Sequence, residues 1–122
     1  METLTPPLVT AVMVDCNDAT VMMRFWGGLL HLEEVGRRAN YTWLGPINQD
    51  GVITLGFQQV DELKTTKNRI HLDMRSRDVK ATVTRIVTLG GSRVAEHGLD
   101  DIAWEVVADP EGNEFCVLPF RD

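Results

Sequence analysis

Apolar and polar positions alternate along the chain with two periods, and these periods predict strands and helices in a definite order. Residues 8–14 have the composition of a strand. The next segment, CNDATVMMRFWGGLL, carries apolar side chains at helical spacing, and Asn17 or Asp18 is suited to cap it. The helix side chains expected in the core are Val21, Met22, Phe25, Trp26 and Leu29. Three short strands are then predicted at residues 32–38, 41–45 and 51–59.

The second half of the chain repeats this order. A polar stretch, residues 60–67, leads to RIHLDMR, in which His71, Asp73 and Arg75 alternate with apolar residues. Asp78 then caps a second predicted helix, which ends at Gly90-Gly91. Strands are predicted at residues 91–97, 101–109 and 113–119, and the turn Asp109-Pro110-Glu111-Gly112 joins the last two.

The two halves align without a gap at an offset of 60 residues, so that Asp18 falls on Asp78 and Leu29 on Leu89. Few residues are identical between the two halves, so the alignment depends on the pattern of apolar and polar positions. It predicts one α+β domain of 122 residues, with a first βαβββ module at about residues 8–60 and a second at about residues 68–120. Neither module is large enough to fill a core alone, so we expect the two to pack together.

The composition of the chain argues against several classes of function. The net charge is −6, which argues against binding to nucleic acid or to an anionic membrane surface. No apolar run approaches the ~20 residues of a membrane helix, and the opening METLTPPLVT lacks the features of a signal peptide. Cys16 and Cys116 match no zinc-binding spacing. We therefore expect a cytoplasmic protein with a small-molecule partner.

Two βαβββ modules closed by ADPEGNEFCVLP resemble the vicinal oxygen chelate superfamily, which includes glyoxalase I, extradiol dioxygenases, methylmalonyl-CoA epimerase and bleomycin and fosfomycin resistance proteins. The stretches DCNDATVMMRFWGGLL, KNRIHLDMRSRD and DPEGNEFCVL are most similar to its small glyoxalase-like branch, over residues 8–119. The resemblance implies a curved mixed sheet around a shared cup, with the helices outside. It also implies a homodimer, because many relatives pair or swap modules across a dimer.

The resemblance also implies metal-ligand positions on the first and last strands of each module. Residue by residue, these positions carry Ala11, Gln58, His71 and Cys116. Alanine binds no metal, and a hard ion such as Mg²⁺ favours carboxylate oxygens. Zn²⁺ would accept His71 and Cys116 but needs a third ligand, and Glu114 lies ~7 Å along the same strand face. We therefore expect no cofactor, with a divalent metal at His71 as the alternative.

His71 has three interpretations at this point. It is a hydrogen-bonded strand histidine, a neutral imidazole that faces the cup and exchanges protons near neutral pH, or a metal ligand. Glu114 is the candidate acid–base partner of His71. Cys116 is most simply a small buried apolar group, though it faces the cup in this alignment.

Other residues are candidates for ligand contacts. Trp43 and Trp104, with Tyr41, are suited to line an aromatic cup wall, although packing between helix and sheet is the simpler interpretation. Arg75 shares the face of His71 and is a candidate contact for an anion. The basic residues Lys64, Lys67 and Arg69 form either a solvated crossover loop or a clamp for an anionic ligand. The predicted ligand-binding set is Gln58, Arg75, Trp104, Cys116 and Trp43.

The sequence therefore predicts a glyoxalase-like protein that binds a small organic ligand in the cup of its sheet. If the protein is an enzyme, we expect metal-independent lyase- or isomerase-like chemistry in which His71 and Glu114 move protons. One alternative is a non-catalytic protein of the bleomycin-resistance type that sequesters a drug or metabolite. Another is a metal-dependent glyoxalase or dioxygenase.

Overall fold

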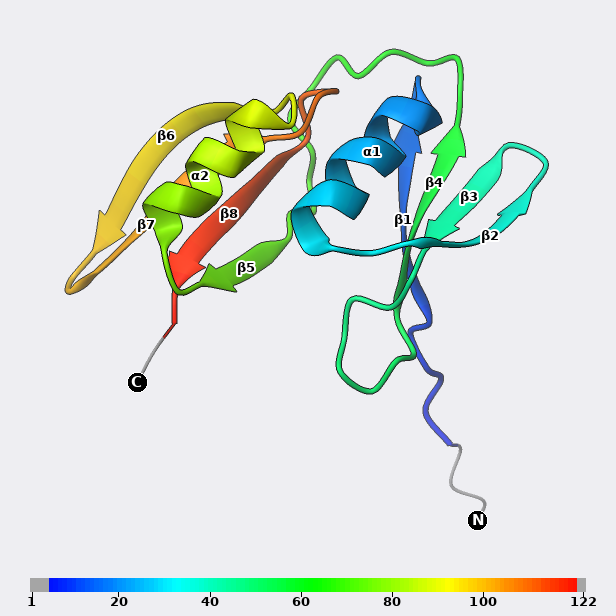
Figure 1. Ribbon diagram of the computed structural model, residues 1–122, viewed down its shortest axis with the longest axis horizontal. Helices are drawn as coiled ribbons and strands as arrows, with labels where there is room; N and C mark the ends of the chain where they lie inside the picture. Colours follow the sequence, from blue (N-terminus) through cyan, green and yellow to red (C-terminus); the bar gives the residue numbers. More distant parts are fainter. Residues whose placement is uncertain (1–4, 121–122) are drawn as a thin grey trace.

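A computed structural model of the chain describes residues 5–120, in which two modules follow each other with the same order of elements (Figure 1). The first module consists of β1 (Ala11–Cys16), α1 (Ala19–Leu30), β2 (Glu34–Arg38), β3 (Tyr41–Leu44) and β4 (Thr54–Gln59). The second consists of β5 (Asp73–Ser76), α2 (Val79–Thr88), β6 (Ser92–Leu99), β7 (Ile102–Ala108) and β8 (Glu114–Pro119). The predicted α+β fold with tandem βαβββ modules is confirmed.

Each module builds its own four-stranded mixed sheet. The strand order is β1-β4-β3-β2 in the first sheet and β5-β8-β7-β6 in the second. In both sheets the first strand of the module pairs in parallel with its last strand, and the other pairs are antiparallel. The helices cover the same side of the two sheets, towards the viewer in Figure 1. The opposite side of each sheet therefore remains open for a site.

Both helices begin at the predicted aspartates. The Asp18 side chain accepts a hydrogen bond from the Val21 backbone N–H at 3.2 Å, and Asp78 accepts one from Ala81 at 3.0 Å. Neither helix in residues 5–120 is long and apolar enough to cross a membrane. Each half of the sequence repeat thus folds into one sheet covered by one capped helix.

The two modules share one hydrophobic core. In α1, Met22, Phe25 and Trp26 are buried, as the helical spacing predicted. The Trp26 ring lies 4.7 Å from the ring of Phe115 on β8, measured between centroids, so a helix of module one packs on a strand of module two. The remaining buried members of this core are Cys16, Ala19, Leu44, Leu55, Phe57, Ile86, Val107 and Val117.

The turn between β7 and β8 connects module two to α1. Asp109 is buried, and its carboxylate accepts hydrogen bonds from the Trp26 indole N–H at 3.3 Å and from the Asn113 backbone N–H at 3.0 Å. The Glu111 carboxylate accepts the backbone N–H groups of Asn17 and Asp18 at 2.7 and 2.8 Å. The DPEGN segment therefore holds the start and the middle of the first helix.

The strand predicted around His71 begins later than expected. Residues 69–71 lie outside the β5–β8 ladder, the Leu72 carbonyl accepts the Cys116 N–H at 2.9 Å, and Asn68 bonds to β8 through its side chain. The Asn68 amide accepts the Glu114 N–H at 2.9 Å and donates to the Glu114 carbonyl at 3.2 Å. β5 starts at Asp73, and His71 lies in the segment that leads into it.

Candidate functional site

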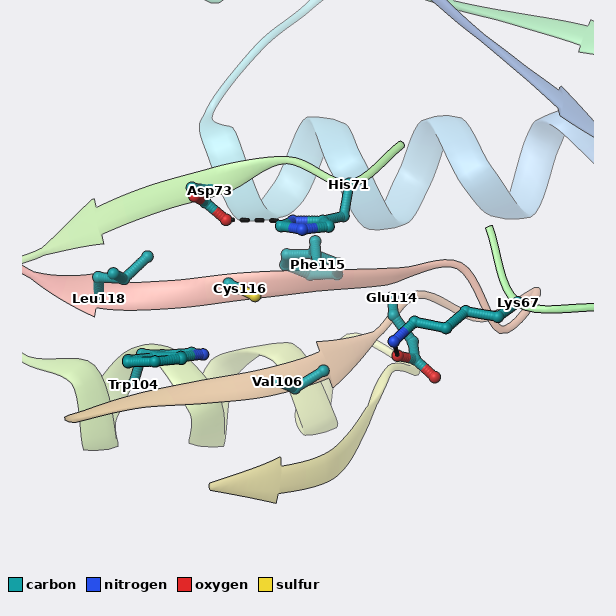
Figure 2. Close-up of a pocket in the computed structure, with 9 residues that line it drawn as sticks. All are labelled: Lys67, His71, Asp73, Trp104, Val106, Glu114, Phe115, Cys116 and Leu118. Carbon is teal, nitrogen blue, oxygen red and sulfur yellow. Dashed lines mark ion pairs between the residues drawn. The ribbon is translucent and has the colours of Figure 1, made fainter. Parts of the chain in front are cut away.

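A cavity of about 380 Å³ lies on the face of the second sheet opposite α2 (Figure 2). Its apolar surface comes from Trp104 and Val106 on β7 and from Leu118 on β8, with Phe115 beneath. The polar side chains extend along the cavity from Asp73, past His71 and Cys116, to Glu114 and Lys67 at the end where the chain enters β8. The residues that supply them are Lys67, His71, Asp73, Glu114 and Cys116.

Sheet register explains why these side chains share one face. Cys116 lies opposite Asp73 on β5 and opposite Val106 on β7. Side chains two residues apart on a strand point to the same face, which adds Glu114 and Leu118. The intervening residues Phe115 and Val117 are buried in the core on the helix side. Alternation in the sequence of β8 therefore separates the site from the core.

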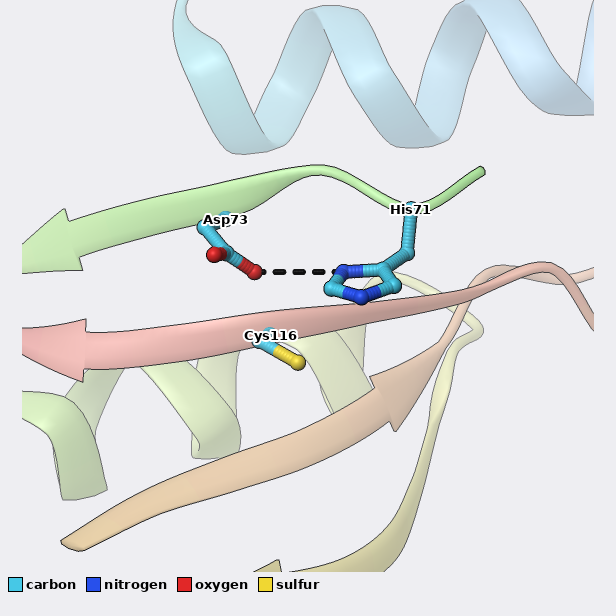
Figure 3. Close-up of side chains that lie close together, drawn as sticks. All are labelled: His71, Asp73 and Cys116. Atoms are coloured by element: carbon cyan, nitrogen blue, oxygen red, sulfur yellow. Dashed lines mark ion pairs between the residues drawn. The ribbon is translucent and has the colours of Figure 1, made fainter. Parts of the chain in front are cut away.

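His71, Asp73 and Cys116 converge within this row of polar side chains (Figure 3). The Nδ1 atom of His71 lies 3.2 Å from a carboxylate oxygen of Asp73, and the two side chains are 50% and 59% exposed. The Sγ atom of Cys116 completes a group in which one ligand atom from each residue lies within 4.8 Å of the other two. An imidazole, a carboxylate and a thiol thus face one point that solvent can reach.

The Cys116 thiol keeps its proton in this environment. Burial raises the pKa of the thiol, and the negative charge of Asp73 raises it further. A thiol becomes a strong nucleophile only as the thiolate, which a depressed pKa would favour. Cys116 is therefore not set up as a free nucleophile.

Glu114 and Lys67 form a second polar pair at the mouth of the cavity. The Lys67 ammonium lies 3.7 Å from the Glu114 carboxylate, with side chains 74% and 28% exposed. Lys67 comes from the crossover segment between the modules, so the basic cluster predicted there contributes one residue to the site. Of its other members, Arg69 lines a neighbouring groove, and Lys64 donates to the carbonyl of Thr66.

The structure brings together four of the predicted site residues, namely His71, Glu114, Trp104 and Cys116. Gln58 lies on β4 of the first sheet, where it is paired with Tyr41 on β3. Arg75 donates a hydrogen bond to the Pro119 carbonyl at 2.9 Å and does not line the cavity.

Trp43 is also outside this cavity. Its ring stacks on Tyr41 with the centroids 5.9 Å apart, on the open face of the first sheet. A Cβ atom at Gly56 would lie 2.8 Å from the Trp43 ring and 2.3 Å from the sulfur of Met13, so glycine at this position allows the two side chains to cover β4. The first sheet thus has an aromatic face of its own.

The four metal positions implied by the resemblance do not form one site within residues 5–120. Ala11 has no donor atom, and Gln58 is absent from the side chains around the cavity. Ala11 instead lines a groove of about 570 Å³ between β1 and residues 68–72, which also contains His71. A hard ion held by ligands from both modules therefore does not fit these residues.

Asp73 is the site residue for which sequence analysis proposed no role. The signal was present, because Asp73 follows His71 by two residues in an alternating segment and so was expected on the same face. Its proximity to Cys116 depends on the parallel pairing of β5 with β8, which joins residues more than forty positions apart. Local spacing alone does not specify that register.

Comparisons with known proteins agree with this architecture. The family model of the glyoxalase-like domain matches residues 11–118. A glyoxalase-related enzyme from Fulvimarina pelagi superimposes with a TM-score of 0.72 at 16% identity, over 93% of this chain and 88% of that one. A glyoxalase/bleomycin resistance protein from Albidiferax ferrireducens gives 0.68 at 22% identity, over 92% and 98%.

A fosfomycin resistance protein from Listeria monocytogenes, solved with Mn(II) and a dihydroxypropylphosphonic acid, gives a TM-score of 0.74 at 16% identity, over 97% of this chain and 93% of that one. A comparison with curated proteins finds no match. At these identities the similarity to solved structures establishes a common fold and no common activity.

Proposed function

Because the chain belongs to the glyoxalase-like domain family, we propose that it binds a small organic molecule in the cavity on its second sheet. The observation that carries this proposal is the division of the cavity into an apolar floor and a row of polar side chains. Small-molecule sites combine a mostly apolar lining with a few convergent polar groups, and a volume of about 380 Å³ lies in their usual range. The ligand would place an apolar body on Trp104, Val106 and Leu118.

The row of polar side chains defines the head group of the ligand. Lys67 supplies an exposed ammonium at the mouth, and His71 supplies an imidazole that donates or accepts a hydrogen bond. These groups favour a ligand with an oxygen-rich head, such as a carboxylate, phosphonate or carbonyl. A solved structure of similar fold, the fosfomycin resistance protein from Listeria monocytogenes, contains a dihydroxypropylphosphonic acid, which has a head group of this kind.

If the bound ligand reacts, the geometry favours proton transfer by His71. The Asp73 carboxylate lies 3.2 Å from Nδ1 and favours a proton on that nitrogen, which would leave Nε2 of a neutral ring as the proton acceptor. Glu114, the acid–base partner expected from the sequence, lies in the same cavity but is paired with Lys67. We therefore propose His71 as the base and Asp73 as the residue that orients it, in lyase- or isomerase-like chemistry.

Sequestration without reaction is the second candidate function. It is favoured by the apolar, aromatic floor, which gives affinity without any need for a reactive group. The two functions differ in one measurable respect. A sequestering protein keeps its ligand unchanged, whereas an enzyme converts it and loses turnover when His71 is replaced.

A binding screen tests the proposal. Thermal-shift and calorimetric titrations with 2-oxoaldehydes, CoA thioesters, fosfomycin and bleomycin should identify one class that stabilises the protein. Trp104→Ala should weaken binding of that ligand by about five- to thirtyfold, because an aromatic contact contributes ~1–2 kcal/mol. Phe120→Ala is the matched control, since Phe120 is an exposed ring under Arg77 that does not line the cavity.

Two results would reject the proposal: equal loss of affinity in Trp104→Ala and Phe120→Ala, or unchanged affinity in Trp104→Ala. For the enzymatic version, His71→Asn should abolish turnover while it retains binding within a few fold. Turnover that survives this substitution would leave sequestration as the function.

We further propose that the protein is a cytoplasmic homodimer. The open face of the first sheet, with Tyr41, Trp43 and Met13, is apolar enough to meet a second copy. Cys16 and Cys116 are both free thiols, which suits a reducing compartment. Analytical ultracentrifugation tests the dimer, and Trp43→Glu should shift the equilibrium toward the monomer.

A further inference from the structure

We propose that a separate cavity, beside the two helices, binds a small phosphate monoester through Arg75, Arg77 and Arg85. This arginine cavity has a volume of about 410 Å³ and lies between the last turn of α1, strand β5 and one face of α2 (Figure 1). It shares no lining residue with the cavity on the second sheet. The inference therefore goes beyond the proposed ligand-binding function and does not depend on it.

The elements that carry the three arginines explain why they meet. Arg75 lies near the end of β5, Arg77 belongs to the turn that follows, and Arg85 lies on α2. The α2 residues at the cavity are spaced by three or four positions from Asp78 to Arg85, so they share one face of the helix. Sequence analysis named only Arg75 as a candidate contact for an anion. Helical spacing brings Arg85 to the same place.

The charge of the arginine cavity is not balanced by the protein. Although the net charge of the chain is −6, none of the three guanidinium groups forms an ion pair with a carboxylate of residues 5–120, whereas Arg37 and Arg93 do. The one carboxylate in the lining belongs to Asp78, and it caps α2 by accepting the Ala81 backbone N–H at 3.0 Å. Three positive side chains and one negative one leave a charge of +2, which a dianion would balance.

Two of the arginines are held in a way that leaves donor groups for a ligand. Arg75 donates one N–H to the Pro119 carbonyl at 2.9 Å. Arg77 lies over the ring of Phe120, with its guanidinium carbon 4.6 Å from the ring centroid. Stacking occupies the face of the guanidinium and leaves the N–H groups in its plane, which suits paired contacts to phosphate oxygens.

A pair of hydroxyl groups adds a further donor. The Oγ atom of Ser76 lies 2.6 Å from the Oγ1 atom of Thr82. Because only one of the two hydroxyls donates to the other, the second keeps its proton for an oxygen of the ligand. The arginine cavity thus combines charged and neutral donors, as a phosphate group requires.

The remaining lining is suited to an organic group. Leu29 and Leu30 of α1 and Met74 of β5 give the arginine cavity an apolar side, which inorganic phosphate would not use. A phosphate monoester carries nearly two negative charges at neutral pH and also brings an organic part. A large polyanion such as nucleic acid would meet the negative charge of the rest of the chain, so we assign a small ligand.

Calorimetric titration of the full-length protein with phenyl phosphate tests the proposal. Inorganic phosphate and phenol serve as the two halves of this probe. Phenyl phosphate should bind at least about fivefold more tightly than inorganic phosphate, because its ring meets the apolar side. Phenol should show no measurable binding to the arginine cavity, and added NaCl should weaken the binding of phenyl phosphate.

Variants locate the bound anion. Arg85→Gln should weaken the binding of phenyl phosphate by about tenfold, because a charge-assisted contact is lost. Arg24→Gln is the matched control, since it removes the same charge from an exposed position of α1 outside the cavity and should leave the affinity within about twofold. Arg77→Lys keeps the charge but loses the paired contact, so its affinity should lie between those of the wild type and Arg85→Gln. Circular dichroism shows that each variant is folded.

Four outcomes would overturn the proposal. They are no binding of phenyl phosphate by the wild type, unchanged affinity in Arg85→Gln, equal loss in Arg85→Gln and Arg24→Gln, or equal affinity for phosphate and phenyl phosphate. Lys67→Gln separates this proposal from the function proposed above. Binding that is lost in Lys67→Gln and kept in Arg85→Gln would place the anion on the second sheet, which rejects the arginine cavity and supports the proposed function. Failure of the ligand screen on the second sheet leaves the arginine cavity standing.

Discussion

At the scale of single residues, the two cysteines show how position decides chemistry. Both are free and nearly inaccessible to solvent, and both thiols have a raised pKa. Cys16 belongs to the core, whereas Cys116 faces the cavity beside Asp73 and His71. Cys116 therefore lines the candidate site, whereas Cys16 lies outside it, beside a separate groove.

Cys16 gives a pH prediction with a definite sign. Burial, followed by the charge of Glu111, raises the pKa of Cys16 from 9.0 to about 11. The unfolded thiol loses its proton near pH 9.0 while the folded one keeps it, so folding stability falls as the pH rises through this window. Urea unfolding across this range should show a steeper loss in the wild type than in Cys16→Ala. Parallel pH profiles in the two proteins would contradict the assignment.

At the scale of elements, the repeat in the sequence predicted the order of helices and strands and the two βαβββ modules, and the structure confirms both. Apolar spacing placed Met22, Phe25 and Trp26 in the core of α1, and the aligned aspartates Asp18 and Asp78 both became helix caps. These features are local, so the sequence expresses them directly. The start of β5 was predicted too early: the strand begins at Asp73, and just before it Asn68 bonds to Glu114 on β8 through its side chain, a contact that apolar periodicity does not predict.

The turn between β7 and β8 shows a structural use of the DPEGN segment. Asp109 is buried and bonded to N–H groups of Trp26, Glu111 and Asn113, and burial raises the pKa of its carboxyl while these hydrogen bonds lower it. Because Trp26 belongs to α1, the carboxylate links the last hairpin to module one. The resemblance identified this motif by its sequence, and the structure explains it as a contact between the modules.

Removal of this carboxylate should therefore destabilise the whole chain. Asp109→Ala leaves several buried N–H donors without an acceptor and should lower the free energy of unfolding by ~2–4 kcal/mol. Asp109→Asn retains one acceptor oxygen and should fall between the alanine variant and the wild type. Chemical denaturation of the three proteins measures the effect. An unchanged midpoint in Asp109→Ala would show that the turn does not hold the modules together.

At the scale of the whole molecule, the sequence predicted a site but not which surface forms it. His71, Glu114, Trp104 and Cys116 were identified and do meet in one cavity. Gln58 and Trp43 lie on the first sheet and do not reach this cavity. Whether the two sheets share a cavity depends on how the modules pack, through core contacts such as Trp26 with Phe115. Lys67 reaches the site from the crossover segment, whose path also depends on how the modules pack. Which of the predicted site residues line the cavity is therefore decided by long-range packing, which local sequence pattern does not predict.

The cavity on the second sheet and the groove beside β1 offer two places for a ligand, and tryptophan reports on each. Trp104 lines the cavity and not the groove, whereas Trp26 lines the groove and not the cavity. The indole N–H resonances of ¹⁵N-labelled protein, assigned with Trp104→Phe, therefore distinguish the two sites. On titration with the ligand that stabilises the protein, the Trp104 resonance should shift in a saturable way, and the Trp26 resonance should stay in place. A shift of Trp26 with no response from Trp104 would contradict the account.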